Sequence, residues 1–324
     1  MKIVGALLSA AVVTMALAVP ACAAQSSLTV NVFQGMQNLP LFAAQQKGFF
    51  AERGLSVNLE ITPSSDEQRA GLADGKYQII HCGIDNGVAM ADVAKVDVAA
   101  VIGGDNGFNR LIVQPDIHAI SDLRGKTVIV DAPDTAYAFQ LYEMLKRGGL
   151  DKGEYTIKSV GATAKRLVDI QQNKDDKASM LNPPFAFTAQ NDGLKDQGSA
   201  VSTIGPYQAT AGIVLRSWAK DHPDILIKYL EAYIEGLRYV LDPKNKDEAT
   251  KMLADGLKLP PDVAAATYAV ATDPAEGLAK DGRFDGPGFD NVLRLRADWT
   301  GHAPRPAAAY FDLSYYEKAL AGLG

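Results

Sequence analysis

Short runs of alternating apolar and polar residues recur along the chain from about residue 28, and segments with helical spacing separate them. Alternation is typical of half-buried strands, whereas apolar residues three and four positions apart are typical of amphipathic helices. Strands joined by helices in regular order predict a parallel sheet with crossover helices. In the first third of the chain the expected strands cover residues 28–32, 55–61, 77–82 and 98–102, and the expected helices cover residues 39–47, 66–72 and 88–94.

A second block of the same kind follows a strand predicted at residues 109–113 and a loop that carries Pro115. The chain then returns through a strand at 212–215 to a mostly helical tail. The strongest helix of this tail places apolar side chains on one face, at Leu226, Leu230, Tyr233, Leu237 and Val240. The expected strands of the second block cover 127–130, 156–160 and 179–181, and its helices run through Tyr137–Leu145 and over 164–172.

Two thin connections between the blocks, one near Pro115 and one near Tyr207, predict a protein with two lobes. Residues 25–114 together with 208–324 would form lobe 1, and residues 115–207 would form lobe 2. A chain that crosses to a second lobe and returns leaves a cleft, and hinge closure around a ligand is a known behaviour of this geometry. We therefore expect an α/β fold with two lobes, each a mixed, mostly parallel sheet flanked by helices, and a ligand cleft between the lobes.

Residues 1–24 have the pattern of a signal peptide. Lys2 provides a positive start, residues 4–19 carry no charge, and small residues surround Cys22 ahead of an expected cleavage site near Ala24. The alternatives are a retained membrane anchor, for which the apolar run is short, and lipid attachment at Cys22. Cleavage would release the protein into the periplasm with Cys82 as its only cysteine and therefore without an internal disulfide.

Charge and the scarcity of reactive residues argue against several classes of function. The 324 residues contain 32 Lys and Arg against 38 Asp and Glu, a formal charge of −6, and no basic run, which argues against a nucleic-acid partner. The four histidines and two cysteines form no metal-binding or catalytic motif, so we expect no metal, no cofactor and no enzymatic activity. His81 and Cys82 are adjacent, and adjacent side chains on a strand point to opposite faces, so the imidazole cannot activate the thiol.

Loops at the carboxyl ends of the predicted strands provide the candidate ligand-binding residues, because ligands of open α/β sheets bind there. The amides of residues 34–38 are the best candidates, since they have no evident structural role. Asp85 and Asp134, in contrast, stand where they could simply cap helices. The full set of candidates is Gln34, Met36, Gln37, Asn38, Ile84, Asp85, Asn86, Asp105, Asp134, Thr135, Ala136, Asn182, Phe185 and Tyr207.

Three stretches of the chain resemble a known family. They are GMQNLPLFAAQQKGFFAERGLSVNLEI (35–61), ISDLRGKTVIVDAPDTAYAF (120–139) and WAKDHPDILIKYLEAYIEG (218–236). In these stretches the chain is similar to periplasmic solute-binding proteins of ABC importers for sulfonates, taurine, nitrate and thiamine precursors, the SsuA/THI5-like or NMT1-like family. The resemblance implies a type II periplasmic-binding fold that captures a small solute for the permease and ATPase subunits of an importer. We expect this protein to act as a monomer.

Two other functions stay open at this stage. A secreted enzyme of the same fold, desulfinase-like or pyrimidine-precursor synthase-like, would need a nucleophile in the cleft, for which Cys82 is the one candidate. The other is a sensory subunit, which would bind its ligand in the same way but present it to a receptor instead of an importer. The candidate loops contain several acids but no Lys or Arg, so we expect a neutral or cationic solute, nitrogen-containing or aromatic, rather than an anion.

Overall fold

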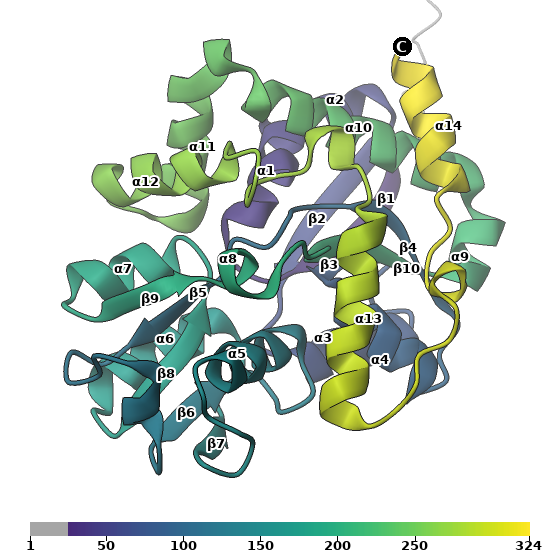
Figure 1. Ribbon diagram of the computed structural model, residues 1–324. Coiled ribbons are helices and arrows are strands. Elements are labelled where there is room, and N and C mark those ends of the chain that lie inside the picture. Colours follow the sequence, from purple (N-terminus) through teal and green to yellow (C-terminus); the bar gives the residue numbers. More distant parts are fainter. Residues whose placement is uncertain (1–24) are drawn as a thin grey trace, which may run out of the picture.

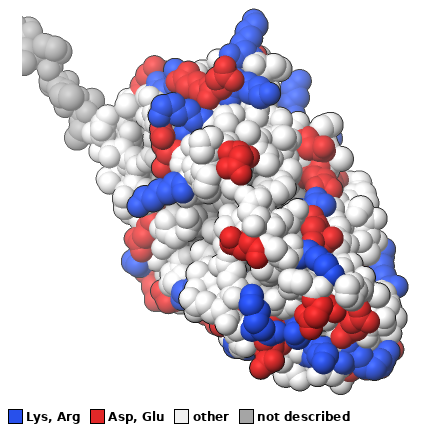
Figure 2. Space-filling view, turned by 90° about the vertical axis from the view of Figure 1, so that its left-hand side faces the viewer, with Lys and Arg blue, Asp and Glu red and all other residues white. Residues whose placement is uncertain are grey.

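The computed structural model describes residues 25–324 and consists of two α/β lobes (Figure 1). The predicted signal peptide at 1–24 lies outside the described residues. Within the described part, no helix combines the length and the apolar character needed to cross a membrane. On the face shown in Figure 2, acidic and basic side chains are interspersed, and no patch of one sign covers it.

The first sheet has five strands in the order β2-β1-β3-β10-β4. β1 pairs in parallel with β2 and β3, and β10 runs antiparallel between β3 and β4. The predicted strands of this lobe are confirmed, with shifts of a few residues at their ends. The strands are β1 (Ser26–Val32), β2 (Leu55–Ile61), β3 (Ile79–Gly83), β4 (Val98–Gly103) and β10 (Thr210–Leu215).

The second sheet also has five strands, in the order β7-β6-β8-β5-β9. β6 pairs in parallel with β7 and β8, and β5 runs antiparallel between β8 and β9. The edge strand β9 was not predicted, because its sequence KDQGS has no apolar alternation. The strands are β5 (Arg110–Val113), β6 (Thr127–Val130), β7 (Thr156–Ser159), β8 (Asp176–Leu181) and β9 (Lys195–Ser199).

The two sheets share one topology although no repeat is visible in the sequence. In each sheet the single antiparallel strand is the first strand after the chain enters that lobe from the other, β5 on the way out and β10 on the way back. The first crossing therefore lies between Gly103 and Arg110, and not near Pro115 as predicted. The strand at Arg110–Val113 was assigned to lobe 1 but pairs within the second sheet.

Helices cover both sheets, and α10 is the central helix of lobe 1. Its predicted apolar face is fully buried against the first sheet and α1. α1 and α10 approach closely at Gly236, where a Cβ would lie 2.2 Å from the carbonyl oxygen of Pro40. The helices up to this point are α1 (Leu39–Gln46), α2 (Phe49–Glu52), α3 (Ser65–Ala73), α4 (Ile84–Asp92), α5 (Ala136–Arg147), α6 (Thr163–Gln172), α7 (Phe185–Asn191), α8 (Ala200–Ile204), α9 (Arg216–Asp221) and α10 (Pro223–Leu241).

The helical tail returns to the junction of the lobes. Figure 1 shows α13 standing beside both lobes, and it packs against α4 of lobe 1 and α5 of lobe 2. α12 in turn contacts α7 of lobe 2. The tail therefore bridges the lobes in addition to the two crossing segments. Its helices are α11 (Lys246–Leu257), α12 (Pro261–Ala271), α13 (Gly286–Thr300) and α14 (Ser314–Leu323).

Candidate ligand-binding site

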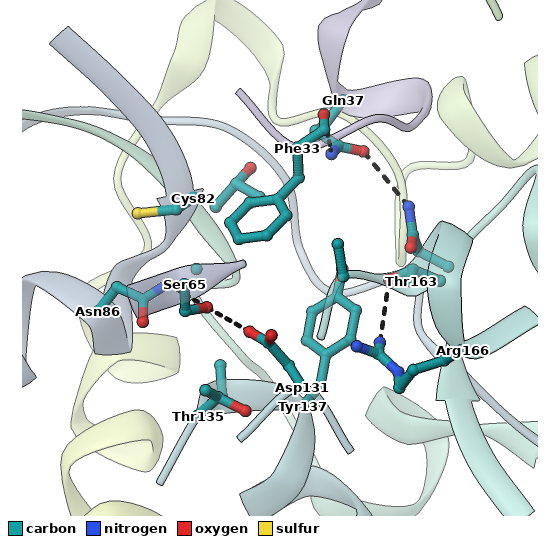
Figure 3. A pocket seen from close by; sticks show the side chains of 15 residues that line it. Phe33, Gln37, Ser65, Cys82, Asn86, Asp131, Thr135, Tyr137, Thr163 and Arg166 are labelled. Carbon is teal, nitrogen blue, oxygen red and sulfur yellow. Dashed lines mark hydrogen bonds between the residues drawn. The ribbon is translucent and has the colours of Figure 1, made fainter. Parts of the chain in front are cut away.

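A cavity of about 490 Å³ lies between the lobes, counting all the space between its lining atoms (Figure 3). Its lobe 1 wall comes from the ends of β1 and β3 and from the starts of α3 and α4. Its lobe 2 wall comes from the loop after β6, the starts of α5 and α6, and Asn182 after β8. This is the position at which open α/β sheets bind ligands.

Hydrogen bonds join the two walls of this cavity directly. Ser65 in α3 donates to a carboxylate oxygen of Asp131 in lobe 2. The amide of Asn182 donates to Oε1 of Gln37 at 3.5 Å, and the backbone N–H of Ala162 donates to the carbonyl of Pro63 at 3.2 Å. Because each bond joins one lobe to the other, the structure represents a closed arrangement of the lobes.

A buried arginine, Arg166 of α6, reaches the cavity from lobe 2. Its side chain is 2% exposed and donates to the hydroxyl groups of Ser179 and Thr163, at 3.2 and 3.0 Å, and to the carbonyl groups of Gly161 and Met180. All four acceptors are neutral, and Arg166 makes no ion pair within the described residues. Burial lowers the pKa of Arg166 below its ordinary value, as expected for a charge removed from water.

Two aromatic rings face the cavity from opposite lobes. Phe33 follows β1, and Tyr137 lies in the first turn of α5, and Figure 3 shows both rings directed toward the centre. The guanidinium of Arg166 lies 5.5 Å from the centroid of the Tyr137 ring, within the range of cation–π attraction. A flat group bound between the rings would contact both lobes at once.

Hydrogen-bond acceptors accompany these rings. Asn86, 4% exposed, donates to Ser65 at 3.4 Å, while its Oδ1 has no hydrogen-bond partner. Asp131 accepts from Ser65 and stands in the same cavity as Arg166. The cavity thus offers hydrogen-bond acceptors at Asn86 and Asp131 and a cation at Arg166. Such a wall suits a solute that carries both donors and acceptors.

The fold and this site agree with the comparisons to known proteins. A family model described as "NMT1/THI5 like" matches residues 36–246, which is 211 of the 324 residues. The chain belongs to the NMT1/THI5-like family. This confirms the resemblance seen in the sequence. The match covers both lobes and includes the residues of the cavity apart from Phe33.

Several solved structures share the fold of this NMT1/THI5-like protein. The periplasmic nitrate-binding protein NrtA of Synechocystis PCC 6803 superposes with a TM-score of 0.79 at 13% identity, over 92% of this chain and 89% of that one. The alkanesulfonate-binding protein SsuA of Xanthomonas axonopodis pv. citri, bound to MOPS, gives 0.71 at 15% identity, over 92% and 99%. The predicted two-lobed α/β fold is confirmed.

Two further similarities qualify what the fold implies. YtlA of Bacillus subtilis (strain 168), described as a "Putative binding protein", is 24% identical over 258 residues, which are 71% of this chain and 72% of YtlA. The desulfurization enzyme DSZB superposes with a TM-score of 0.64 at 14% identity, over 91% of this chain and 99% of that one. Because an enzyme shares the fold, the fold alone does not distinguish binding from catalysis, and the residues of the site decide between them.

The structure brings seven of the fourteen candidate residues to the cavity or to a smaller one behind it. Thr135 and Ala136 line the cavity at the start of α5, and Thr135 donates to the carbonyl of Ala132 at 2.9 Å. Whether any of these residues contacts a solute stays a prediction. The seven are Gln37, Asn86, Thr135, Ala136 and Asn182 in the main cavity, Asp105 and Tyr207 in the smaller one, with Ala136 shared by both.

The other candidates lie elsewhere. Met36, Ile84 and Phe185 are buried in apolar clusters, because the residue that begins or precedes a helix often packs inward. Gln34 is half-buried and does not line either cavity. Asn38 is fully buried and donates to the carbonyl of Phe33 at 2.7 Å. The view that the amides of 34–38 have no structural role was therefore wrong for Asn38.

The capping role considered for Asp85 and Asp134 was also wrong. Asp85 lies inside the first turn of α4, is 1% exposed, and forms an ion pair with Arg296 of α13. Asp134 precedes α5 without capping it; its carboxylate lies 3.9 Å from Arg69, and its carbonyl accepts from Arg296 at 3.3 Å. Neither residue lines the cavity, because each is turned toward a basic side chain.

Several lining residues were missed because they lie on helices and not in strand-end loops. Ser65, Tyr137, Thr163 and Arg166 are in this group, whereas Phe33 was missed although it lies in the loop after β1. Arg166 left a signal in the sequence, since it shares the inward face of α6 with Thr163 and Ile170, at helical spacing. A charged residue on an apolar face is either paired or functional.

The one described cysteine lies at the cavity wall but in an unreactive setting. Cys82 is 2% exposed, and burial raises the pKa of its thiol to about 12. His81, on the opposite face of β3, bonds to the hydroxyl of Tyr229 at 2.8 Å, and burial lowers the pKa of its imidazole to about 4. The prediction that the two side chains cannot cooperate is confirmed. No group of His, Cys, Asp and Glu in the described part of the chain is arranged to hold a metal ion.

Proposed function

We propose that this protein is the extracytoplasmic solute-binding component of an ABC import system. The observation that carries the proposal is the cavity itself, because its polar and aromatic lining comes from both lobes and the two walls hydrogen-bond to each other. Membership of the NMT1/THI5-like family supports it. Structures of the same fold include a nitrate-binding and an alkanesulfonate-binding protein.

Binding would act through the balance between open and closed lobes. A solute that contacts Phe33 and Gln37 of lobe 1 and Tyr137 and Arg166 of lobe 2 gains its full contact energy only in the closed state. The equilibrium then shifts by the difference between its affinities for the two states, and by no more. The permease and ATPase subunits of the importer would recognise the closed form.

The solute fits the description of a small organic molecule, nitrogen-containing or aromatic. The rings of Phe33 and Tyr137 provide flat apolar surfaces, and Asn86 and Asp131 provide acceptors for N–H groups. Arg166 places a cation at the cavity, whereas the candidate loops of the sequence contain no Lys or Arg. With one carboxylate and one guanidinium on the wall, a neutral solute or one carrying both charges is favoured over a simple anion.

The proposed act is binding without turnover. At neutral pH the Cys82 thiol is protonated, because its pKa is about 12, and a protonated thiol is a poor nucleophile. The imidazole of His81 points to the other face of the sheet and is held by Tyr229. These two observations favour a solute receptor over a desulfinase-like enzyme. We therefore expect a solute incubated with the protein to be recovered chemically unchanged.

Native mass spectrometry of the mature protein, purified from its host without denaturation, tests the proposal. We expect a co-purifying small molecule at up to one per chain, which is released on unfolding. The variant Ala136→Phe should carry none, because Ala136 is 5% exposed and a phenyl group there fills the cavity. The matched variant Ala51→Phe, at an exposed site in α2, should retain the molecule. Equal occupancy in both variants would contradict the proposed site.

A further inference from the structure

A second, smaller cavity, the inner cavity, adjoins the first and has room for about one water-sized group. The two share Gly83, Ala136, Tyr137 and Thr210 on their walls. The inner cavity lies beside the two crossing segments, since Asp105 follows β4 on the way out and Thr210 begins β10 on the way back. The backbone joins these segments here, with the N–H of Ala209 donating to the carbonyl of Asp105 at 3.2 Å.

Asp105 brings a carboxylate into this cavity without a cation to balance it. The residue is 1% exposed, and it accepts from the hydroxyl of Thr210 and from the N–H of Gly107 at 2.9 Å. It makes no ion pair within residues 25–324. A carboxylate offers about four acceptor positions, so capacity is left over. A buried charge without a partner is costly, and proteins retain such a charge where it has a function.

A second acceptor in the same wall also has no partner. Asn109 is 1% exposed, and its amide nitrogen donates to Oε1 of Gln140 at 2.8 Å, while its Oδ1 has no hydrogen-bond partner. The titratable groups around Asp105 are the hydroxyl groups of Tyr137, Tyr207 and Tyr233, with His81 stacked on Tyr233 at 5.1 Å. Burial holds the pKa values of these tyrosines above the ordinary one and that of His81 below it, so all four are neutral.

We propose that the inner cavity is a subsite for a protonated nitrogen of the solute, a primary ammonium, held by Asp105 and Asn109. The proposal rests on the function proposed above and adds the chemical class of the ligand. The carboxylate supplies the charge, and the unpartnered amide oxygen accepts a second N–H. The rest of such a solute would lie in the main cavity, which shares Gly83 and Thr210 with the inner one and is lined by the rings of Phe33 and Tyr137.

The test uses the full mature protein, freed of solute by unfolding and refolding, and matched probe compounds. Benzylamine and phenethylamine carry a ring and a primary ammonium. Benzyl alcohol has the ring alone, and ammonium chloride and sodium chloride supply the cation alone. We expect at least one of the two aromatic amines to raise the melting temperature and to give a measurable Kd by calorimetry, and benzyl alcohol to give neither. The subsite would be overturned if benzyl alcohol stabilised the protein as much as the aromatic amines do. It would also be overturned if none of the probes stabilised the protein. Equal stabilisation by ammonium or sodium ions alone would assign the cavity to a free cation and overturn the link to the solute.

Variants locate the effect. Asp105→Asn keeps the shape of the side chain and should weaken binding of the stabilising cation at least about tenfold, as the loss of a buried charge partner does. The same substitution at the exposed Asp74, Asp74→Asn, should leave the Kd unchanged. Should Asp105→Asn fail to fold, Asn109→Ala removes only the unpartnered amide and should weaken binding about threefold to tenfold. Unchanged affinity in the folded variants would overturn the proposal.

Binding should also weaken as the pH falls through about 7, because burial raises the pKa of Asp105 to about that value and protonation removes its charge. An affinity that is constant across this range would contradict the role of Asp105. Failure of the subsite can be told apart from failure of the proposed function. A co-purified solute without a basic nitrogen overturns the subsite and leaves solute binding intact, whereas a protein that carries and binds no solute overturns both.

Discussion

Two regions of the molecule bury an arginine in different ways. Arg296 of α13 and Arg166 of α6 are 6% and 2% exposed, and their guanidinium groups lie 5.6 and 5.5 Å from the ring centroids of Phe139 and Tyr137. Arg296 donates to both oxygens of Asp85, at 3.0 and 2.9 Å, where α13 packs on the lobes. Arg166, at the cavity, has only neutral acceptors.

The carboxylates of the two regions repeat this difference. Asp85 is held by Arg296, whereas Asp105 in the inner cavity has no cation. Burial raises the pKa of Asp85 to about 6, with Arg296 opposing the shift, and raises that of Asp105 to about 7. Pairing with Arg296 offsets part of the desolvation cost of Asp85, whereas no cation offsets that of Asp105. We infer that the ion pair between Asp85 and Arg296 helps to hold α13 on the lobes. The charges of Arg166 and Asp105, in contrast, are left available for a solute.

The largest expected effect comes from breaking the pair at α13. Arg296→Met leaves Asp85 buried without a partner and should lower the free energy of unfolding by about 3–5 kcal/mol, measured by urea denaturation. The double variant Asp85→Leu/Arg296→Met should recover most of the loss, since neither charge remains. A single variant as stable as the wild type would remove the distinction between the two regions.

The next effect separates the two carboxylates by their dependence on pH. The folded-state pKa of Asp105, about 7, lies above the ordinary value of 3.8, so its contribution to stability is present below about pH 3.8 and is lost as the pH rises through about 7. Asp105→Asn should abolish this loss and exceed the wild type in stability above pH 7 by roughly 2–4 kcal/mol. Parallel stability curves for the two proteins between pH 4 and 8 would show that Asp105 does not titrate as described.

Replacing the unpaired arginine should affect binding more than folding. Arg166→Met leaves four neutral acceptors without a donor and should lower the free energy of unfolding by about 1–3 kcal/mol, less than Arg296→Met. It should weaken binding of the co-purified solute at least about tenfold, measured by calorimetry. Arg296→Met, which lies outside the cavity, serves as the comparison. A larger loss of affinity in Arg296→Met than in Arg166→Met would reverse the assignment of the two arginines.

The smallest effect is expected at Cys82. Cys82→Ala removes a small buried group and should change the free energy of unfolding by no more than about 1 kcal/mol. Solute affinity should stay within about twofold of the wild type. In the native protein the thiol should react with a chromogenic disulfide reagent only as fast as the protein unfolds. Rapid modification under native conditions would instead support a role for Cys82 as a nucleophile.

Much of the fold could be predicted from the sequence because both lobes use strong local patterns. The alternating residues of β1 and β2 and the apolar face of α10 are properties of short segments, so periodicity reveals them. β9 could not be found in this way, because its pairing with β5 depends on the backbone and not on its polar side chains. The position of the first crossing was displaced for a related reason, since strand β5 gives no local sign of which sheet it joins.

The site could be predicted only in part. The rule that ligands lie beyond the carboxyl ends of strands directed attention to Gln37, Asn86 and Asn182, which do line the cavity. It could not distinguish these from neighbours such as Met36, whose direction is set by packing. Contacts between residues distant in sequence, such as Asp85 with Arg296 across 211 positions, leave no mark in a single chain.

The central claim, that two lobes close on a small solute, is tested most directly by small-angle X-ray scattering on the solute-free protein before and after the co-purified solute is returned. We predict that the radius of gyration falls on addition of the solute and that the curve then matches the closed structure. The Ala136→Phe variant should show no change. Identical scattering curves for the free and loaded wild-type protein would contradict the account.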